Sequence, residues 1–226
     1  MNYQRIKKYW EKEESKVHRG NENDLRKFAE NIVEILELNY NQRILDVGCG
    51  EGSVDFYLKQ KVKKLSGFDF SSNKLAKAIK KNPECHYWNQ SFLNDYKDKN
   101  FDVVFSFSVM QYCHPLHQFE FLDKSIMAVT SNGLVAHLDI PDYSKIFQYY
   151  ITGQEGIRKK IIGCLKYIIY KIYPFLILYR DGSYWSNLKK LKRHLEANGF
   201  HVDLKDSECY YRSHLVISRI KKSYSP

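Results

Sequence analysis

The sequence predicts an α/β protein built on a doubly wound, mostly parallel sheet, and two observations lead to this class. Along residues 41–140, short apolar runs alternate with segments whose apolar residues recur at helical spacing, which is the pattern of strands joined by covering helices. Asp102–Phe107 is almost wholly apolar, as a strand covered on both faces should be. Crossovers between such strands are right-handed.

Two helices are predicted before the first strand. Residues 3–16 are polar and carry apolar residues at helical spacing. A second helix is expected to begin after an N-cap at Asn23 or Asp24. Its apolar face comprises Leu25, Phe28, Ile32, Ile35 and Leu36.

Five strands and the helices between them follow. The predicted strands are Ile44–Val47, Leu65–Phe68, Cys85–Trp88, Asp102–Phe107 and Leu134–Ile140. The predicted helices are Ser53–Lys59, 72–81 and 117–129. Asn132–Gly133 predicts a turn before the fifth strand.

The rest of the chain predicts one more helix, two more strands and an insertion. The helix covers residues 183–198 and ends at Asn198–Gly199, a favourable C-cap; the strands are Phe200–Leu204 and Leu215–Ile220. Residues 141–182 break the alternation. Their apolar run is interrupted by Lys166, Lys171 and Pro174, which favours an inserted helical lid over a transmembrane span.

A length of 226 residues fits one domain. We predict a single domain of N-terminal helices (1–40), a core (41–140), the lid (141–182), and a C-terminal helix and strands (183–220). The first sixteen residues lack an apolar signal region, so a cytoplasmic location is expected. The sequence leaves monomer and homodimer open.

The cysteines and the charge limit the classes of function. The five cysteines are scattered without C-x-x-C spacing, so we expect neither a metal site nor a disulfide framework. A formal net charge of +10 is compatible with an anionic partner, such as nucleic acid, anionic lipid or a phosphorylated substrate. Spread over solvated helix faces, the same charge is also compatible with no such partner.

The candidate chemistry begins at the glycine-rich segment Ile44–Ser53. A strand leads into Gly48, Gly50 and Gly52, and a helix is expected at once. Glycines suit positions where the backbone turns with positive φ or approaches a ligand closely. Asp46 precedes this loop and is suited to a cationic ligand, and Asp69 ends the second strand, where a carboxylate can accept hydrogen bonds from both ribose hydroxyls.

These motifs resemble the class I S-adenosylmethionine-dependent methyltransferases, in their small-molecule branch. LDVGCGEG (45–52) is similar to the first motif of that family, and GFDFS (67–71) to the second. NFDVVFSFSVMQY (100–112) and SNGLVAHLDIP (131–141) are similar to the regions of the fourth and fifth strands. The resemblance covers residues 25–140 well and 183–220 loosely. It implies a Rossmann-like seven-stranded sheet with the last strand antiparallel, and S-adenosylmethionine as cofactor.

The resemblance also implies roles for individual residues. In the loop formed with Cys49 and Gly52, Gly48 and Gly50 would lie against the methionine part and the ribose. Asp46 would support the methionine ammonium group, and Asp69 would hold the ribose hydroxyls. Phe70 would pack on the adenine, and Ser106 would border the methionine.

The sequence departs from the family after the third strand. Many relatives carry an acidic residue there that contacts the adenine amino group. The matching stretch is Asn89–Phe92, without a carboxylate. Gln90 or Ser91 is the expected substitute, and the Phe92 backbone N–H is expected to meet the adenine ring.

The acceptor should lie beyond the carboxyl ends of the fourth and fifth strands. His114 is the first candidate for a general base, because its ordinary pKa is near neutrality; the alternative is a histidine that caps the helix at Pro115. Tyr112 would shape the pocket or hydrogen-bond the acceptor. Asp139 is either a base or a structural acceptor at a strand end. Transfer driven by proximity alone, without a base, is a further alternative.

The first interpretation of the function is O-methylation of a small polar metabolite, such as a sugar or sugar conjugate of the kind used in polysaccharide biosynthesis. A lipid-linked acceptor at a membrane surface is an alternative, since residues 158–180 combine cations with large apolar residues. RNA or DNA methylation is another alternative, suggested by the charge. Ser-Val-Met-Gln follows the fourth strand. Methyltransferases that act on the amino groups of nucleic-acid bases carry an Asn/Asp-Pro-Pro-aromatic motif there, so its absence argues against this alternative. A non-catalytic binding protein is the third class.

Overall fold

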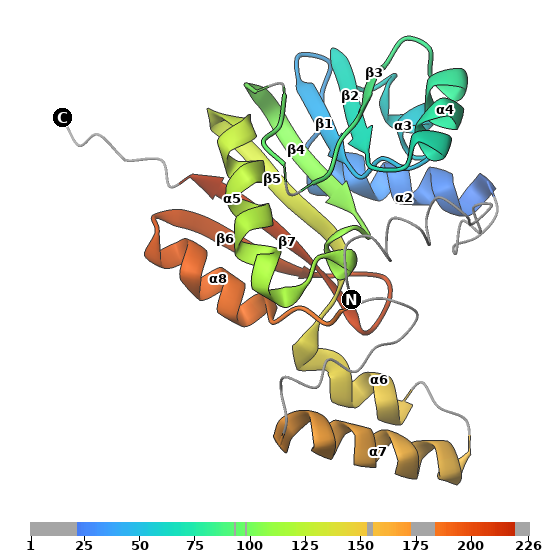
Figure 1. Cartoon of the computed structure of the whole chain (residues 1–226), viewed down its shortest axis with the longest axis vertical. Coiled ribbons are helices and arrows are strands. Elements are labelled where there is room, and N and C mark those ends of the chain that lie inside the picture. The colour runs from blue at the N-terminus through green and yellow to red at the C-terminus, as the bar shows by residue number, and fades with distance from the viewer. Residues whose placement is uncertain (1–21, 93, 98, 153–155, 173–183, 220–226) are drawn as a thin grey trace. The chain divides into compact units, whose positions relative to one another are not determined.

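The computed structural model describes residues 22–92, 94–97, 99–152, 156–172 and 184–219 (Figure 1). The helix predicted within residues 3–16 and the part of the lid at 173–182 lie outside the described residues. Contacts divide the chain into two compact units. The first extends to Phe107 and includes Phe119–Ala136, and the second consists of Ser108–Gln118 and the chain from His137 onward.

The sheet has seven strands in the order β3-β2-β1-β4-β5-β7-β6. The strands are β1 (Arg43–Val47), β2 (Lys64–Asp69), β3 (His86–Asn89), β4 (Phe101–Phe107), β5 (Val129–Pro141), β6 (Phe200–Asp206) and β7 (Arg212–Arg219). β1 pairs in parallel with β2 and β4, and β2 pairs in parallel with β3. β6 and β7 pair antiparallel. The predicted fold class is therefore confirmed.

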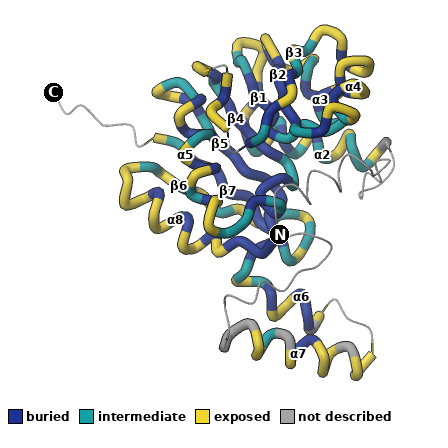
Figure 2. Tube along the Cα trace, viewed as in Figure 1, coloured by how far each residue is buried: buried dark blue, intermediate teal, exposed yellow. Residues whose placement is uncertain are grey.

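The first unit carries the glycine-rich loop. Its helices are α2 (Glu22–Ile35), α3 (Asp55–Leu58), α4 (Ser72–Lys81) and α5 (Gln118–Ala128), of which α5 starts one residue before the unit boundary. α4 has the predicted bounds, and the Ser71 side chain caps it by accepting from the Lys74 backbone N–H. β1 and β4 are buried along nearly their whole length, which places them in the core (Figure 2).

The second unit contains the segments expected near an acceptor. It has three short 3₁₀ helices, η1 (Met110–Tyr112), η2 (Pro115–His117) and η3 (Tyr143–Lys145). It also has α6 (Ile146–Thr152), α7 (Ile157–Ile172) and α8 (Leu188–Ala197). An aromatic cluster of Ile146, Tyr149, Tyr150 and Trp185 forms a small core here. The described part of the predicted lid is thus helical.

Two sequence predictions about local structure are wrong. The last helix begins at Leu188 rather than residue 183, because Asn187 caps it by accepting from the Lys190 N–H. Asn23 and Asp24 both lie within α2, so neither is its N-cap. Asn132–Gly133 lies within the bounds of β5, but a Cβ on Gly133 would come within 2.6 Å of the Val129 Cβ, four residues earlier. Residues four apart in an extended strand are about 13 Å apart, so the chain reverses direction here, as the predicted turn requires.

Candidate functional site

The glycine-rich loop has the backbone conformation that its sequence predicts. Gly48, Gly50 and Gly52 have φ of +77°, +57° and +63°, in the left-handed region that L side chains rarely adopt. A Cβ on Gly50 would meet nothing within 4 Å. A Cβ on Gly52 would lie 2.6 Å from the Asn82 amide nitrogen. Gly50 therefore leaves space for a ligand, whereas Gly52 makes room for packing inside the protein.

Behind the loop, a polar network holds it in place. Asn82 Nδ2 donates to the Gly52 carbonyl at 2.8 Å and to the Tyr87 hydroxyl at 3.1 Å. The Tyr87 hydroxyl donates in turn to Asp55 Oδ2 at 2.8 Å. Asn82 and Asp55 are fully buried. The sequence analysis missed all three residues because they come from β3 and the ends of α3 and α4, and only the fold brings them beneath the loop.

Asp46 and Asp55 form a buried carboxyl pair. Burial raises the pKa of Asp46 well above its ordinary value, and the neighbouring Asp55 and Asp69 raise it further. Burial also raises the pKa of Asp55 to about 6. Asp46 Oδ1 is buried without a hydrogen-bond partner among the described residues. This acceptor would suit the donor that the sequence analysis expects, a ligand ammonium group.

Asp69 lies at the end of β2 and ties the loop to that strand. Its Oδ2 accepts from the Gly50 backbone N–H at 3.0 Å, and its Oδ1 accepts from the Ser71 N–H at 2.8 Å. Burial raises the pKa of Asp69, while these two N–H donors lower it. The Phe70 backbone N–H is a third donor to this carboxylate. The two oxygens have four lone pairs between them, so an acceptor position remains for a ribose hydroxyl.

The two expected substitutes for the missing carboxylate lie directly after β3. The Gln90 amide has partners at both ends, because it accepts from Trp88 Nε1 at 2.9 Å and donates to the Asp95 carbonyl at 3.1 Å. Ser91 is half-buried, and which of the two contacts an adenine stays a prediction. The Phe92 ring packs on Phe121 at 5.2 Å between centroids, so only its backbone is suited to contact an adenine.

Two other predicted cofactor contacts differ in exposure. Phe70, directly after Asp69, is half-buried, as a side chain that packs on a ligand ring should be. The Ser106 side chain is fully buried in β4, so its position favours a supporting role over direct contact. The thiol of Cys49 has a raised pKa because of burial and the carboxyls of Asp55, Asp46 and Asp69.

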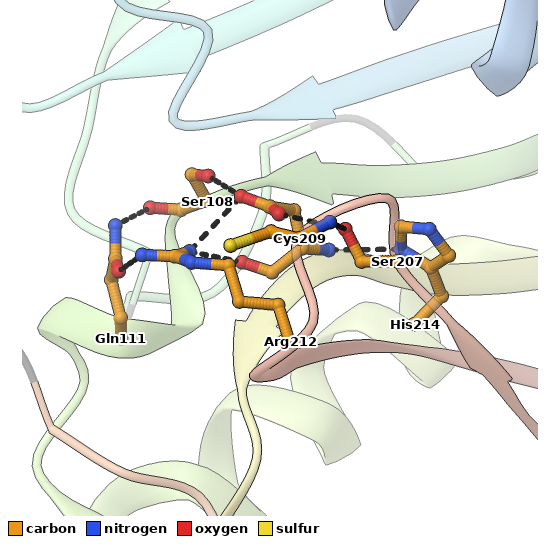
Figure 3. A network of polar contacts seen from close by, with 7 residues as sticks. Ser108, Gln111, Ser207, Cys209, Arg212 and His214 are labelled. Carbon is orange, nitrogen blue, oxygen red and sulfur yellow. Dashed lines mark hydrogen bonds and ion pairs between the residues drawn. The ribbon is translucent and has the colours of Figure 1, made fainter. Parts of the chain in front are cut away.

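In the second unit, a buried ion pair organises the ends of β4 and β5 (Figure 3). Arg212 Nη1 donates to Asp139 Oδ2 at 3.0 Å and to the Asp139 carbonyl at 2.6 Å. Arg212 Nη2 donates to Gln111 Oε1 at 2.8 Å. The hydroxyls of Ser108 and Ser207 donate to the Asp139 carboxylate. The Asp139 backbone N–H donates to His214 Nδ1 at 3.0 Å.

This network carries two strained residues. Ser108 and Asp139 have φ of +58° and +59°, a region that costs a residue with a side chain about 1–3 kcal/mol. Such strain persists where the surroundings hold it, and it concentrates near functional sites. The Asp139 carboxylate accepts from an arginine and two hydroxyls. These contacts favour a structural acceptor at a strand end over a general base. Arg212, Ser108 and Ser207 were missed because they belong to distant parts of the chain.

Two histidines of the second unit, His114 and His137, have restricted chemistry. His114 Nδ1 accepts from the Leu116 backbone N–H at 3.2 Å and so caps η2. Partial burial and the neighbouring His117 lower the pKa of His114, so the ring is neutral at pH 7 with its proton assigned to Nε2. His137 is fully buried, which lowers its pKa to about 3. Tyr112 is half-buried at the end of η1.

Comparisons with known proteins agree with this geometry. Residues 44–133 match the family model described as a methyltransferase domain. Protein 235L of Invertebrate iridescent virus 6, which carries a provisional methyltransferase name, is 29% identical over 194 residues, covering 71% of this chain and 69% of the viral protein.

Two solved structures share the fold. Magnesium protoporphyrin IX methyltransferase from Synechocystis, with bound S-adenosylhomocysteine, has a TM-score of 0.63 and 14% identity, and the match covers 97% of this chain and 100% of that one. CalS10, an amino pentose methyltransferase from Micromonospora echinaspora with bound S-adenosylmethionine, has a TM-score of 0.62 and 12% identity, covering 89% and 92%. The matching family model therefore identifies residues 44–133 as a methyltransferase domain, and the loop and Asp69 have the geometry expected of a domain that binds S-adenosylmethionine.

Proposed function

We propose that this methyltransferase methylates a hydroxyl group of a small polar metabolite, such as a sugar or a sugar conjugate. The observation that carries the methyl-transfer part is the open side of Gly50 next to the two acceptor oxygens of Asp69. The likeness to CalS10 supports a sugar-type acceptor. The Ser-Val-Met-Gln sequence that follows β4 does not favour the amino group of a nucleic-acid base.

The residues of the first unit fit the cofactor. When bound, S-adenosylmethionine supplies an activated methyl group on a sulfonium sulfur. Asp69 would hold its ribose through a charge-assisted hydrogen bond. Asp46 would accept from its ammonium group through the buried Oδ1. Gly48 and Gly50 would lie against the ligand because no side chain stands in the way.

In the reaction, the acceptor oxygen forms a bond to the methyl carbon while the bond from that carbon to sulfur breaks. The electron pair stays on sulfur, and the acceptor loses its hydroxyl proton to a base or to water. With Nδ1 used as a cap, His114 presents an Nε2–H donor. We therefore propose that His114 orients the acceptor oxygen rather than deprotonating it.

A second candidate is methylation of an amine on the same class of acceptor. The side chains of Asp139 and His137 are fully buried, and His114 uses Nδ1 as a cap. A neutral amine attacks without prior loss of a proton, so it needs no dedicated base. CalS10, described as an amino pentose methyltransferase, also points in this direction.

One experiment separates these candidates. The purified chain is incubated with S-adenosylmethionine and either a nucleotide-linked hexose or the corresponding amino hexose, and products are detected by mass spectrometry. O-methylation predicts product from both sugars on the same hydroxyl, whereas N-methylation predicts product from the amino sugar alone. Product from neither sugar, together with intact binding of S-adenosylhomocysteine, would reject the sugar class but not methyl transfer.

A variant tests the role of His114. His114→Asn keeps a side-chain acceptor for the Leu116 N–H, so η2 should stay capped. Loss of a general base lowers kcat by about 10²–10⁴-fold, whereas loss of one orienting hydrogen bond should lower it by only about tenfold. A fall of a hundredfold or more in a stably folded variant would restore His114 as the base.

A further inference from the structure

Helix α7 (Ile157–Ile172) presents an exposed apolar face. In the described part of the chain it carries six exposed large apolar side chains, each between 42% and 76% exposed. They are Ile157, Ile161, Ile162, Leu165, Ile168 and Ile169. At 100° per residue these positions fall within an arc of about 140°. They form a surface that Arg158 alone interrupts near its amino-terminal end, named here the α7 apolar face.

The opposite side of α7 is already occupied. Gly163 is buried, and a Cβ there would lie 2.5 Å from the Tyr150 carbonyl of α6. The Tyr167 ring packs against Phe147 of α6 at 5.1 Å and against the aromatic cluster. α6 thus contacts α7 through a glycine and an aromatic ring, and this packing leaves the apolar face pointing away from α6.

The charges of α7 all have one sign. The helix contains Arg158, Lys159, Lys160, Lys166 and Lys171 and no acidic residue, and α6 carries no charged residue. Arg158 and Lys160 are exposed. At 100° per residue Arg158 falls within the arc of the α7 apolar face, and Lys160 falls on the side of Tyr167. An exposed apolar face accompanied only by cations is complementary to a bilayer that has anionic headgroups. A patch on a soluble partner would need acidic groups around an apolar groove, which is a more restrictive requirement.

The length of α7 excludes one mode of attachment. Sixteen residues of helix extend about 24 Å, less than the hydrocarbon core, and in the described part of the chain no helix is long and apolar enough to cross a membrane. We propose that α7 lies in the plane of an anionic membrane surface, with its apolar face among the acyl chains and its cations at the headgroups. This inference does not depend on the proposed acceptor.

Vesicle co-sedimentation of the full chain tests the proposal. The vesicles contain phosphatidylcholine alone or phosphatidylcholine with phosphatidylglycerol, at low and high salt. The wild type should pellet with the anionic vesicles, and less so at high salt, because the headgroup attraction is screened. Ile161→Glu/Leu165→Glu should weaken binding by about tenfold or more per substituted side chain.

A matched variant separates the face from general surface chemistry. Ile79→Glu on α4 replaces an isoleucine of similar exposure in the first unit and should bind vesicles like the wild type. Circular dichroism and S-adenosylhomocysteine binding establish that each variant is folded. Absence of wild-type pelleting, or equal loss in both variants, would overturn the proposal. So would a stable dimer by light scattering that Ile161→Glu/Leu165→Glu dissociates without any vesicle binding, because the face would then pack on a second copy.

Discussion

Replacing Asp69 with alanine tests the cofactor site most directly. The carboxylate has an acceptor position left beside the bonds from the backbone N–H groups of Gly50, Ser71 and Phe70. A hydrogen bond to a charged group contributes about 1.5–3 kcal/mol, so loss of the ribose contact should cost about that much. That range corresponds to a dissociation constant raised roughly tenfold to more than a hundredfold.

The assay is calorimetric titration of the folded chain with S-adenosylhomocysteine. Asp102→Ala is the matched control, because Asp102 is also a partly buried carboxylate that accepts from a backbone N–H, that of Arg43 at 2.7 Å. It stands at the start of β4 rather than at a carboxyl end of the sheet. Both variants should lose some stability, but only Asp69→Ala should lose affinity.

The same titration has a pH dependence of known sign. Burial raises the pKa of Asp69, so the carboxylate takes up a proton at a higher pH than an ordinary aspartate and then accepts fewer hydrogen bonds. Wild-type affinity should fall as the pH is lowered through this pKa, and the residual affinity of Asp69→Ala should not follow it. Equal affinities of wild type and Asp69→Ala at pH 7 would refute the assignment of Asp69 to the ribose.

Three further predictions concern the supporting structure. Gly50→Ala and Gly52→Ala should each lose about 1–2 kcal/mol of stability because both positions have positive φ. Only Gly52→Ala also forces its Cβ onto Asn82, so thermal unfolding should show it as the less stable variant. Calorimetry should show that Gly50→Ala is folded but binds the cofactor weakly. The pKa of Asp55 is about 6 in the folded protein, above its ordinary value of about 4. The free energy of unfolding should therefore fall by about 3 kcal/mol as the pH rises from about 4 through about 6. Urea unfolding of Asp55→Asn should show a flatter dependence of stability on pH, and an unchanged dependence would contradict the raised pKa. Arg212→Met leaves the Asp139 carboxylate buried without its cation, so the free energy of unfolding should fall by about 3–5 kcal/mol. Adding Asp139→Asn to this variant should restore part of that stability. A loss under about 1 kcal/mol in urea unfolding would show that the ion pair does not stabilise the unit.

Local patterns were sufficient for the elements of the first unit. The spacing of Leu75 and Ala78 behind the Ser71 cap specifies α4 without help from distant residues. The near-continuous apolar run of β4 reflects burial on both faces. Asn132–Gly133 predicts a reversal of the chain, and the contact of Gly133 with Val129, four residues earlier, agrees with it.

The geometry of the glycine-rich loop could be predicted because its residues follow one another along a short stretch. The three glycines adopt positive φ, and Asp69 meets the Gly50 N–H, as the order of loop, strand and carboxylate implies. The sequence could not show that Gln90 is already bonded at both ends, since that depends on Trp88 and Asp95 meeting the same amide.

By itself, the sequence determined the strand–helix alternation, the glycine-rich loop and the carboxylate at the end of β2, because each depends on residues a few positions apart. Only the tertiary structure decided what Asp139, Asp55 and His114 can do chemically. Arg212 lies 73 residues from Asp139 and Tyr87 lies 32 residues from Asp55, and the fold buries each carboxyl beside its partner. For Asp55, this burial raises the pKa to about 6. The fold also decided which side of α7 is covered, because α6 packs on Gly163 and Tyr167 and leaves the isoleucines exposed.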